Sequence, residues 1–212
     1  MSTITFSEAA GTLVDLNQKL GSENGGQILA GLKRYLRGEN PFEVATWESR
    51  DGLIYITLPP SDGTTGPGWI ERLKAKGFRL SENAVAVLKS KAFKPTTGIV
   101  HRLVVLPAKF FSDSERITRT IRAEGQKRGW KELNPEAVCI LRESFSDEEL
   151  EKMGLLWIVG VHEPVEVDGD PRFLGALRFG VGGWLGTDWA NPDGGWGVSG
   201  AFAWSFSQEN KS

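Results

Sequence analysis

Aromatic residues recur among very small residues near the end of the chain, and this pattern constrains the fold more than any other. Residues 184–206 read WLGTDWANPDGGWGVSGAFAWSF and hold four of the eight tryptophans. Mostly Gly, Ala, Ser, Thr and Val stand between the aromatic residues. Large side chains at the ends of short irregular segments fix those segments by burying apolar area. The pattern predicts either a β-core or loops held by aromatic anchors, in which the identity of the small residues matters little.

A turn is predicted in the middle of this segment, at Asn191-Pro192-Asp193-Gly194. Pro192 presets its own φ for a turn, and we expect Gly194 to adopt the positive φ that follows. Helix formers are scarce after Pro164, whereas helical and strand patterns mix before it. This order of elements favours an α+β fold over a doubly wound parallel sheet.

The middle of the chain shows clear hydrophobic periodicity. Strands are expected over residues 51–59, 97–111 and 155–164. Helices are expected over residues 61–78, 81–93, 112–130 and 146–154. Their expected capping residues are Thr64 or Thr65, Ser81, Ser112 or Ser114, and Ser146. Residues 136–145 fit a helix and a strand equally well.

Residues 1–45 are expected to form a helical hairpin, and residues 46–212 the main domain. The first helix is capped by Ser7 and the second covers residues 27–38, with a Gly-rich joint between them. Their apolar positions at helical spacing are Leu13, Val14, Leu16, Leu20, Ile28, Leu29, Leu32 and Leu36. The hairpin either packs on the rest of the chain or is a separate element, for docking to a partner or for association with a second copy through residues 7–37.

Composition and charge exclude several classes of function. The formal net charge is −2, which gives no electrostatic footprint for nucleic acid or an anionic membrane. No apolar run is long enough to span a bilayer, and the N-terminus lacks the features of a signal peptide, so we expect a cytoplasmic protein. The single cysteine, Cys139, excludes an internal disulfide and a cysteine-based zinc site.

Few residues offer chemistry for catalysis. The two histidines are His101, in the middle of an expected strand, and His162, which is followed by Glu163. An enzyme or regulator with a site near these three residues is the alternative function, with a purely structural C-terminal segment. Neighbouring residues of a strand point to opposite faces, so His162 and Glu163 are not expected to converge. Cys139 stands among apolar residues and is expected to be inert.

Clusters of charged residues are expected to lie at the surface. Residues 163–170 contain four carboxylates, but their spacing does not fit the twelve-residue calcium loop, so an acidic surface turn is favoured over a calcium site. The helix expected over residues 112–130 carries basic residues interleaved with acidic ones, which favours a solvated face over a surface that binds DNA. These basic residues are Arg116, Arg119, Arg122, Lys127 and Arg128.

Residues 184–204 resemble, in unbroken register, the variable repeat of proteins that are diversified by diversity-generating retroelements. In that family, asparagine codons of a template copy are rewritten at their adenines. The anchor residues match position by position: Leu185, Trp189, Asn191, Pro192, Asp193, Trp196 and Phe202. The template asparagines fall on small residues, each of which is reachable by changing only adenines. Residues 61–164 also resemble uncharacterised proteins of candidate-phylum bacteria that end in the same way.

The resemblance implies a C-type-lectin-like fold over residues 46–212, with residues 176–206 as a variable region that binds a protein ligand. It implies no catalytic residue, metal or cofactor. The calcium motif of lectins is reduced to Glu163-Pro164-Val165, and the usual closing Gly-Phe-Arg is replaced by Ala201-Phe202-Ala203. The implied ligand-binding residues are Trp184, Gly186, Thr187, Asp188, Trp189, Ala190, Gly194, Gly195, Trp196, Gly197, Val198, Ser199 and Gly200.

Overall fold

A computed structural model describes residues 6–21, 29, 32, 36, 45–180 and 182–206. The chain divides into two compact units, Met1–Val44 and Ala45–Ser212. In the first unit, α1 covers Phe6–Leu20, and its Leu13 and Val14 are exposed. Most of the second helix expected over residues 27–38 lies outside the described residues, which include only three isolated helical positions there.

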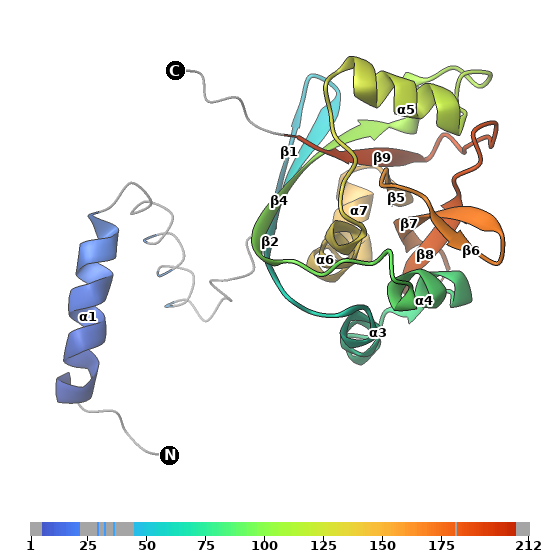
Figure 1. Cartoon of the computed structure of the whole chain (residues 1–212). Helices are drawn as coiled ribbons and strands as arrows, with labels where there is room; N and C mark the ends of the chain where they lie inside the picture. The colour runs from blue at the N-terminus through green and yellow to red at the C-terminus, as the bar shows by residue number, and fades with distance from the viewer. Residues whose placement is uncertain are drawn as a thin grey trace. The chain divides into compact units, whose positions relative to one another are not determined.

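The second unit contains a nine-stranded sheet with strand order β1-β2-β4-β9-β5-β7-β8-β3, and β6 pairs with β7 beside this path (Figure 1). Most neighbouring strands are antiparallel, but β5 runs parallel to β9 and β3 parallel to β8. The strands are β1 (Thr46–Arg50), β2 (Leu53–Asp62), β3 (Arg79–Leu80), β4 (Thr97–Pro107), β5 (Trp157–Gly160), β6 (Val165–Val167), β7 (Asp170–Arg178), β8 (Gly183–Trp189) and β9 (Gly200–Ser205).

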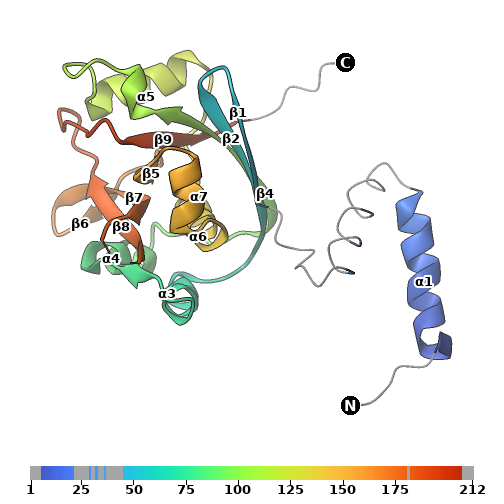
Figure 2. The same ribbon diagram turned by 180° about the vertical axis from the view of Figure 1, so that it is seen from behind.

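Helices cover both faces of the sheet, and because the sheet is largely antiparallel the unit is an α+β structure. They are α3 (Gly66–Ala75), α4 (Glu82–Lys89), the short 3-10 helix η1 (Ala108–Phe110), α5 (Thr118–Lys127), α6 (Pro135–Ser144) and α7 (Asp147–Lys152). The larger core joins one face of the sheet to α3, α4, α6 and α7, whereas the smaller core joins the other face to α5. Figure 2 shows β9 between α5 on one side and α6 and α7 on the other. No helix among the described residues is long and apolar enough to cross a membrane.

Capping residues define most helix starts where the sequence predicts them. Thr65, Ser81 and Ser146 each accept a hydrogen bond from a backbone N–H in the first turn of α3, α4 and α7. The ambiguous segment over residues 136–145 is the helix α6, because Asn134 caps it and Pro135 occupies its first turn.

The start of α5 differs from the prediction. Neither Ser112 nor Ser114 caps it; the helix begins at Thr118, after Ile117, which makes no capping hydrogen bond through its side chain. Ser112 instead bonds to Glu115 in the preceding loop. Arg116, expected on the solvated basic face, is buried and donates to the carbonyl oxygens of η1 and its flank.

The C-terminal segment lies within the sheet. The strand β9 pairs with β4 on one side and with β5 on the other, and β8 pairs with β7 and β3. Side chains on both faces of β9 are therefore buried, including Phe202 and Trp204 in the smaller core. The residues that connect β8 to β9 form the loop 190–199, which contains the predicted turn.

Candidate functional site

Aromatic rings form the floor beneath the loop 190–199. The ring centroids of Trp157, Trp196 and Phe202 lie 5.1–5.7 Å from one another. Such spacings are typical of favourable aromatic pairs. The indole Nε1–H of Trp196 also donates a hydrogen bond of 2.9 Å to Oγ1 of Thr118, on α5. These three rings therefore connect the loop both to the strands β5 and β9 and to the helix α5.

Main-chain carbonyl groups of the turn at the start of the loop accept hydrogen bonds from the first N–H groups of α5. The backbone N–H groups of Thr118 and Arg119 donate to the carbonyl oxygens of Gly194 and Pro192, at 3.1 and 2.8 Å. The first N–H groups of a helix have no partner within the helix and need acceptors. The turn supplies them, which explains why Ile117 needs no capping side chain.

The predicted turn forms, but with a different backbone at its glycine. The N–H of Gly194 donates to the carbonyl oxygen of Asn191 at 2.9 Å. Gly194 is not among the residues of positive φ, so our expectation for its backbone was wrong. It stands at the fourth position of the turn, where glycine is common and no positive φ is needed.

Main-chain hydrogen bonds also hold the end of the loop. The N–H of Trp196 donates to the carbonyl oxygen of Arg116 at 2.9 Å, and the N–H of Leu156 donates to that of Ser199 at 2.8 Å. At the start, the N–H of Ala190 donates to the carbonyl oxygen of Pro171 at 2.8 Å. The course of the loop is therefore fixed largely by backbone atoms, whatever side chains its exposed residues carry.

The thirteen residues implied as ligand-binding separate into three groups by exposure. The exposed residues are Trp189, Gly195, Gly197, Val198 and Ser199. The half-buried residues are Trp184, Thr187, Asp188, Gly194 and Trp196. The buried residues are Gly186, Ala190 and Gly200. Only the first two groups can contact a ligand in this conformation.

The room for a side chain at each glycine agrees with its exposure: the exposed glycines have open space, and the buried ones do not. A Cβ atom at Gly195 or Gly197 would meet nothing within 4 Å, and neither residue has a positive φ. A Cβ atom at Gly186 would lie 2.3 Å from Cδ1 of Leu177, and one at Gly200 would lie 1.9 Å from Cδ2 of Trp157. The loop thus admits larger residues at its exposed glycines, while Gly200 must remain without a side chain.

The end of β8 carries an exposed aromatic residue, Trp189, which alternates with Asp188 and so projects from the sheet face opposite to the aromatic rings beneath the loop. The side chain of Trp189 is 57% exposed, and the guanidinium of Arg172 lies 5.0 Å from its ring centroid. Arg172 is mostly buried and pairs with Asp170 at 3.0 Å. Burial raises the pKa of the neighbouring Asp188, and the charge of Arg172 opposes that rise. Trp189 and Arg172 are residue types that dominate protein interfaces.

Both ring nitrogens of His162 already have hydrogen-bond partners, so neither is available for proton transfer. Its side chain is fully buried, Nε2 accepts a hydrogen bond of 2.9 Å from the N–H of Leu174, and Nδ1 lies 2.7 Å from the carbonyl oxygen of Glu163. A neutral ring with its proton on Nδ1 satisfies both contacts. Burial lowers the pKa of His162 from 6.5 to about 4, the nearby charge of Arg122 adds to this, and the Glu163 carbonyl opposes it.

The other candidate catalytic groups do not gather around His162. The carboxylate of Glu163 is exposed and lies 3.9 Å from Arg122. His101 lies on β4, where burial lowers its pKa and the charge of Glu136 opposes the shift. Cys139 is fully buried in the larger core, and burial raises the pKa of its thiol well above the usual value. A buried thiol of this kind is unreactive.

The acidic segment 163–170 forms a hairpin. Asp168 and Gly169 both have positive φ and join β6 to β7. Asp170 pairs with Arg172, while Glu163, Glu166 and Asp168 are exposed. Over the described part of the chain, no three His, Cys, Asp or Glu side chains lie close enough to hold a metal ion.

A shallow hollow lies beside the turn and was not expected from the sequence. It has a volume of about 310 Å³ and is lined by Thr118, Arg119, Arg122, Ala123, Gln126, Ala190 and Pro192. The residues of α5 approach this loop only through tertiary packing, so no local signal identifies them. Arg119 pairs with Asp193 across the rim, with both side chains exposed.

Comparison with known proteins adds no assignment. No protein family, curated protein or solved structure matches the chain. The function proposed below therefore rests on the geometry of the loop 190–199 and the strands that flank it.

Proposed function

We propose that the chain is a non-enzymatic binding protein and that residues 46–212 form a C-type-lectin-like domain. Its ligand surface consists of the exposed and half-buried residues of β8 and the loop 190–199. In this proposal, residues 176–206 are the diversified region of a variable protein of a diversity-generating retroelement, and the ligand is a protein. The fold proposal is supported by the contribution of residues 183–205 to the nine-stranded sheet, as β8, β9 and the loop between them.

One observation carries the proposal: the backbone of the loop is held by groups that do not depend on its exposed side chains. Main-chain hydrogen bonds join it to α5, to β7 and to the residue before β5. Gly195 and Gly197 have open space where a side chain would stand. A surface that must accept many different residues needs this separation of frame from contact positions, as antibody loops do.

The present surface favours contact with apolar or aromatic groups of a protein. Val198 on the loop is 52% exposed. Trp189, at the edge beside the loop, presents an exposed ring that contacts Arg172. Leu156 lies next to the loop, since its N–H donates a hydrogen bond to the carbonyl oxygen of Ser199, and its side chain is exposed. Aromatic and arginine residues at the centre of an interface commonly supply most of the binding energy.

A catalytic function near His101, His162 and Glu163 is not supported by the geometry. A general base must reach the proton it removes. His162 is fully buried with both ring nitrogens engaged, and the Glu163 carboxylate is exposed. We therefore propose no enzymatic activity at these residues.

The genomic region that flanks the gene tests the proposed diversification. We expect a near-copy of the codons for residues 176–206 that differs only at adenines, next to a gene for a reverse transcriptase. A flank with neither feature would contradict diversification. The binding surface would then need support from a captured ligand.

A pair of libraries tests the proposed surface itself. One library varies Gly195, Gly197, Val198 and Ser199, and the matched control library varies Ala190 and Gly200. We expect members of the first library to keep the melting temperature and to yield binders to chosen proteins, while members of the second unfold. Equal losses of folded protein in both libraries would show that the loop is core, which would contradict the proposal.

A further inference from the structure

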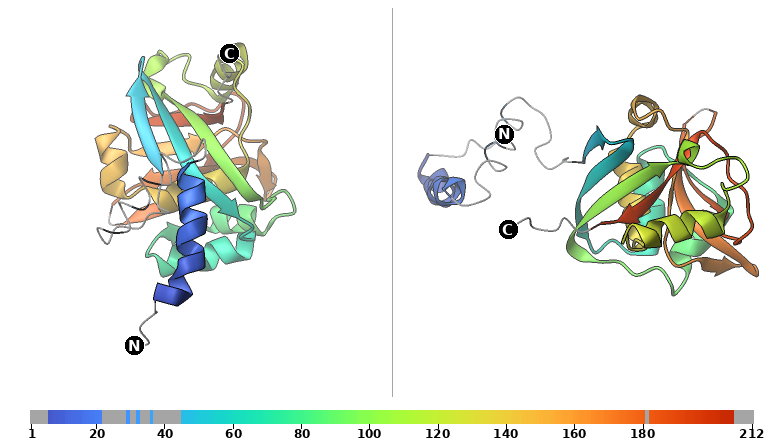
Figure 3. Two further views of the ribbon diagram at one scale, coloured as in Figure 1. Left: turned by 90° about the vertical axis from the view of Figure 1, so that its left-hand side faces the viewer. Right: turned by 90° about the horizontal axis from the view of Figure 1, so that it is seen from above.

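The strand β1 is an edge of the sheet that contains no proline and no bulge. It pairs with β2 over residues 46–50 without a bulge, and no other described strand pairs with it. At the opposite end of the sheet, β3 has only two residues. Figure 3 shows β1 outermost, beside β2 and β4. An exposed edge with unpaired N–H and C=O groups is a template for a further strand unless proline, a bulge or a covering element blocks it, and charged side chains on the edge restrict it to a partner of matching charge.

The hairpin geometry determines which main-chain groups face outward. Asp51 and Gly52 form a two-residue turn, both with positive φ, and Arg50 pairs with Leu53 directly after it. In such a hairpin the flanking pair exchanges both hydrogen bonds, and the pattern alternates along the strand. The N–H and C=O groups of Trp47 and Ser49 therefore point to the unpaired edge.

The side chains of β1 are self-complementary in charge. Glu48 and Arg50 lie on the same face of the strand, with side chains 66% and 58% exposed, and only 3.7 Å apart within one chain. In an antiparallel pair of β1 strands centred on Ser49, Glu48 of each copy stands opposite Arg50 of the other. Centring the pair on Glu48 would oppose two carboxylates instead. Opposite charges across strands are favourable and like charges are not, which selects the first register.

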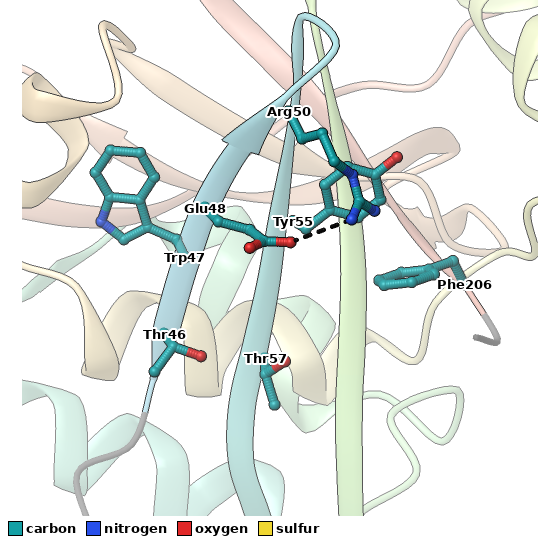
Figure 4. Close-up of a pocket in the computed structure, with 7 residues that line it drawn as sticks. All are labelled: Thr46, Trp47, Glu48, Arg50, Tyr55, Thr57 and Phe206. Carbon is teal, nitrogen blue, oxygen red and sulfur yellow. Dashed lines mark ion pairs between the residues drawn. The ribbon is translucent and has the colours of Figure 1, made fainter. Parts of the chain in front are cut away.

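A hollow on the same face supports a second strand there. It has a volume of about 290 Å³ and is lined by Thr46, Trp47, Glu48, Arg50, Tyr55, Thr57 and Phe206 (Figure 4). Within it the guanidinium of Arg50 lies 4.5 Å from the ring centroid of Tyr55. Trp47 points away from the other side chains in Figure 4, and its Nε1–H donates to Glu149 at 3.1 Å. The two-fold axis of such a pair runs perpendicular to the sheet, between the two Ser49 residues. It therefore leaves the hollows of both copies on the same face of the joined sheet, where they would form a single groove.

We propose that β1 pairs with β1 of a second copy of this chain, antiparallel and centred on Ser49, so that the two sheets continue across a two-fold axis. The Ser49 residues exchange main-chain hydrogen bonds, and two Glu48–Arg50 pairs flank them. This proposal is independent of the proposed function. If both hold, the dimer carries two ligand surfaces, which raises the strength of binding to a repetitive target without any new contact.

Charge reversal with rescue on mixing tests this pairing in the full-length protein. In a dimer of the Glu48→Arg variant, arginine would face arginine at both flanking positions. In a dimer of the Arg50→Glu variant, glutamate would face glutamate at both positions. We expect each variant alone to raise the dimer dissociation constant by about ten-fold or more in sedimentation velocity. A mixture of the two variants restores both opposite-charge pairs, so it is expected to dimerise like the wild type. Both side chains are exposed, so folding is preserved.

A control pair with the same changes in net charge is available on α3. Glu71→Arg and Lys74→Glu are both at exposed positions. Neither variant, nor their mixture, is expected to change the dissociation constant. A wild-type protein that is monomeric at every concentration would overturn the proposal. So would a dimer that is insensitive to Glu48→Arg and Arg50→Glu, as association through α1 would be, or a mixture that fails to restore dimerisation.

Discussion

Gly200 lies against the indole ring of Trp157, so closely that a Cβ atom at Gly200 would stand 1.9–2.3 Å from three carbon atoms of the ring. Gly200 begins β9, and Trp157 begins the neighbouring strand β5. The two residues are partners in the parallel pairing of these strands. This contact places the aromatic floor directly beneath the loop, and it makes glycine a packing requirement at one end of the proposed surface.

Replacing Gly200 by alanine is expected to destabilise the protein by about 2–3 kcal/mol or more, because a strand and a buried ring cannot both keep their positions. Gly197→Ala is the matched control, since its Cβ atom would meet nothing within 4 Å. We expect that variant to lie within about 0.5 kcal/mol of the wild type. Urea denaturation measures both changes. Equal stabilities for the two variants would contradict the close packing at Gly200.

The hydrogen bond between Trp196 and Thr118 is expected to stabilise the loop by about 1 kcal/mol. Trp196→Phe and Thr118→Val each remove one partner and keep most of the apolar contact. Because the two residues share one bond of 2.9 Å, the double variant should cost less than the sum of the single variants. Thermal denaturation of the four proteins measures this coupling. Additive costs would indicate that the bond does not hold Trp196 to α5.

His162 is expected to make stability fall as the pH falls from about 6.5 to about 4. Its folded pKa of about 4 lies below the usual 6.5, so in this window the unfolded chain binds a proton that the folded chain does not. The free energy of unfolding then decreases by up to about 1.4 kcal/mol per pH unit; above pH 6.5 the contribution is complete. Burial of His101 lowers its pKa and acts in the same direction.

The variant His162→Gln tests that pH dependence, because glutamine does not titrate. We expect denaturation curves at pH 7 and pH 4.5 to differ less in the variant than in the wild type. The slope that persists in the variant would include the contribution of His101. An unchanged difference between the two pH values would show that His162 is not the group responsible.

Arg142 is expected to be the most costly charged residue to remove. Its side chain is fully buried, and it donates to the carbonyl oxygens of Leu177 and Phe145 and pairs with Asp147 at 3.0 Å. Arg142→Ala leaves these acceptors unpaired inside the core and should cost about 3–5 kcal/mol. Asp147→Asn keeps a hydrogen-bonding side chain at a partly exposed position, so a smaller loss is expected. Chemical denaturation compares them, and similar losses would contradict a central role for Arg142.

Local sequence signals determined most elements of this protein. Thr65, Ser81 and Ser146 stand before amphipathic runs and cap helices there, because capping depends only on neighbouring backbone groups. The strands β2, β4 and β5 follow from apolar runs bounded by turn residues. The turn at residues 191–194 also follows from its own residues, although its glycine did not need the positive φ that we expected.

Only the tertiary structure decided where these elements meet. The helix α5 starts at Thr118 because the carbonyl oxygens of Pro192 and Gly194, more than seventy residues away, accept its first N–H groups. Gly195 and Gly200 look alike in the sequence, yet one faces open space and the other a tryptophan ring. Capping, periodicity and turns act over a few residues and can be read from the chain. Burial and hydrogen bonding between distant segments depend on how β9 inserts between β4 and β5, and no local pattern specifies that placement.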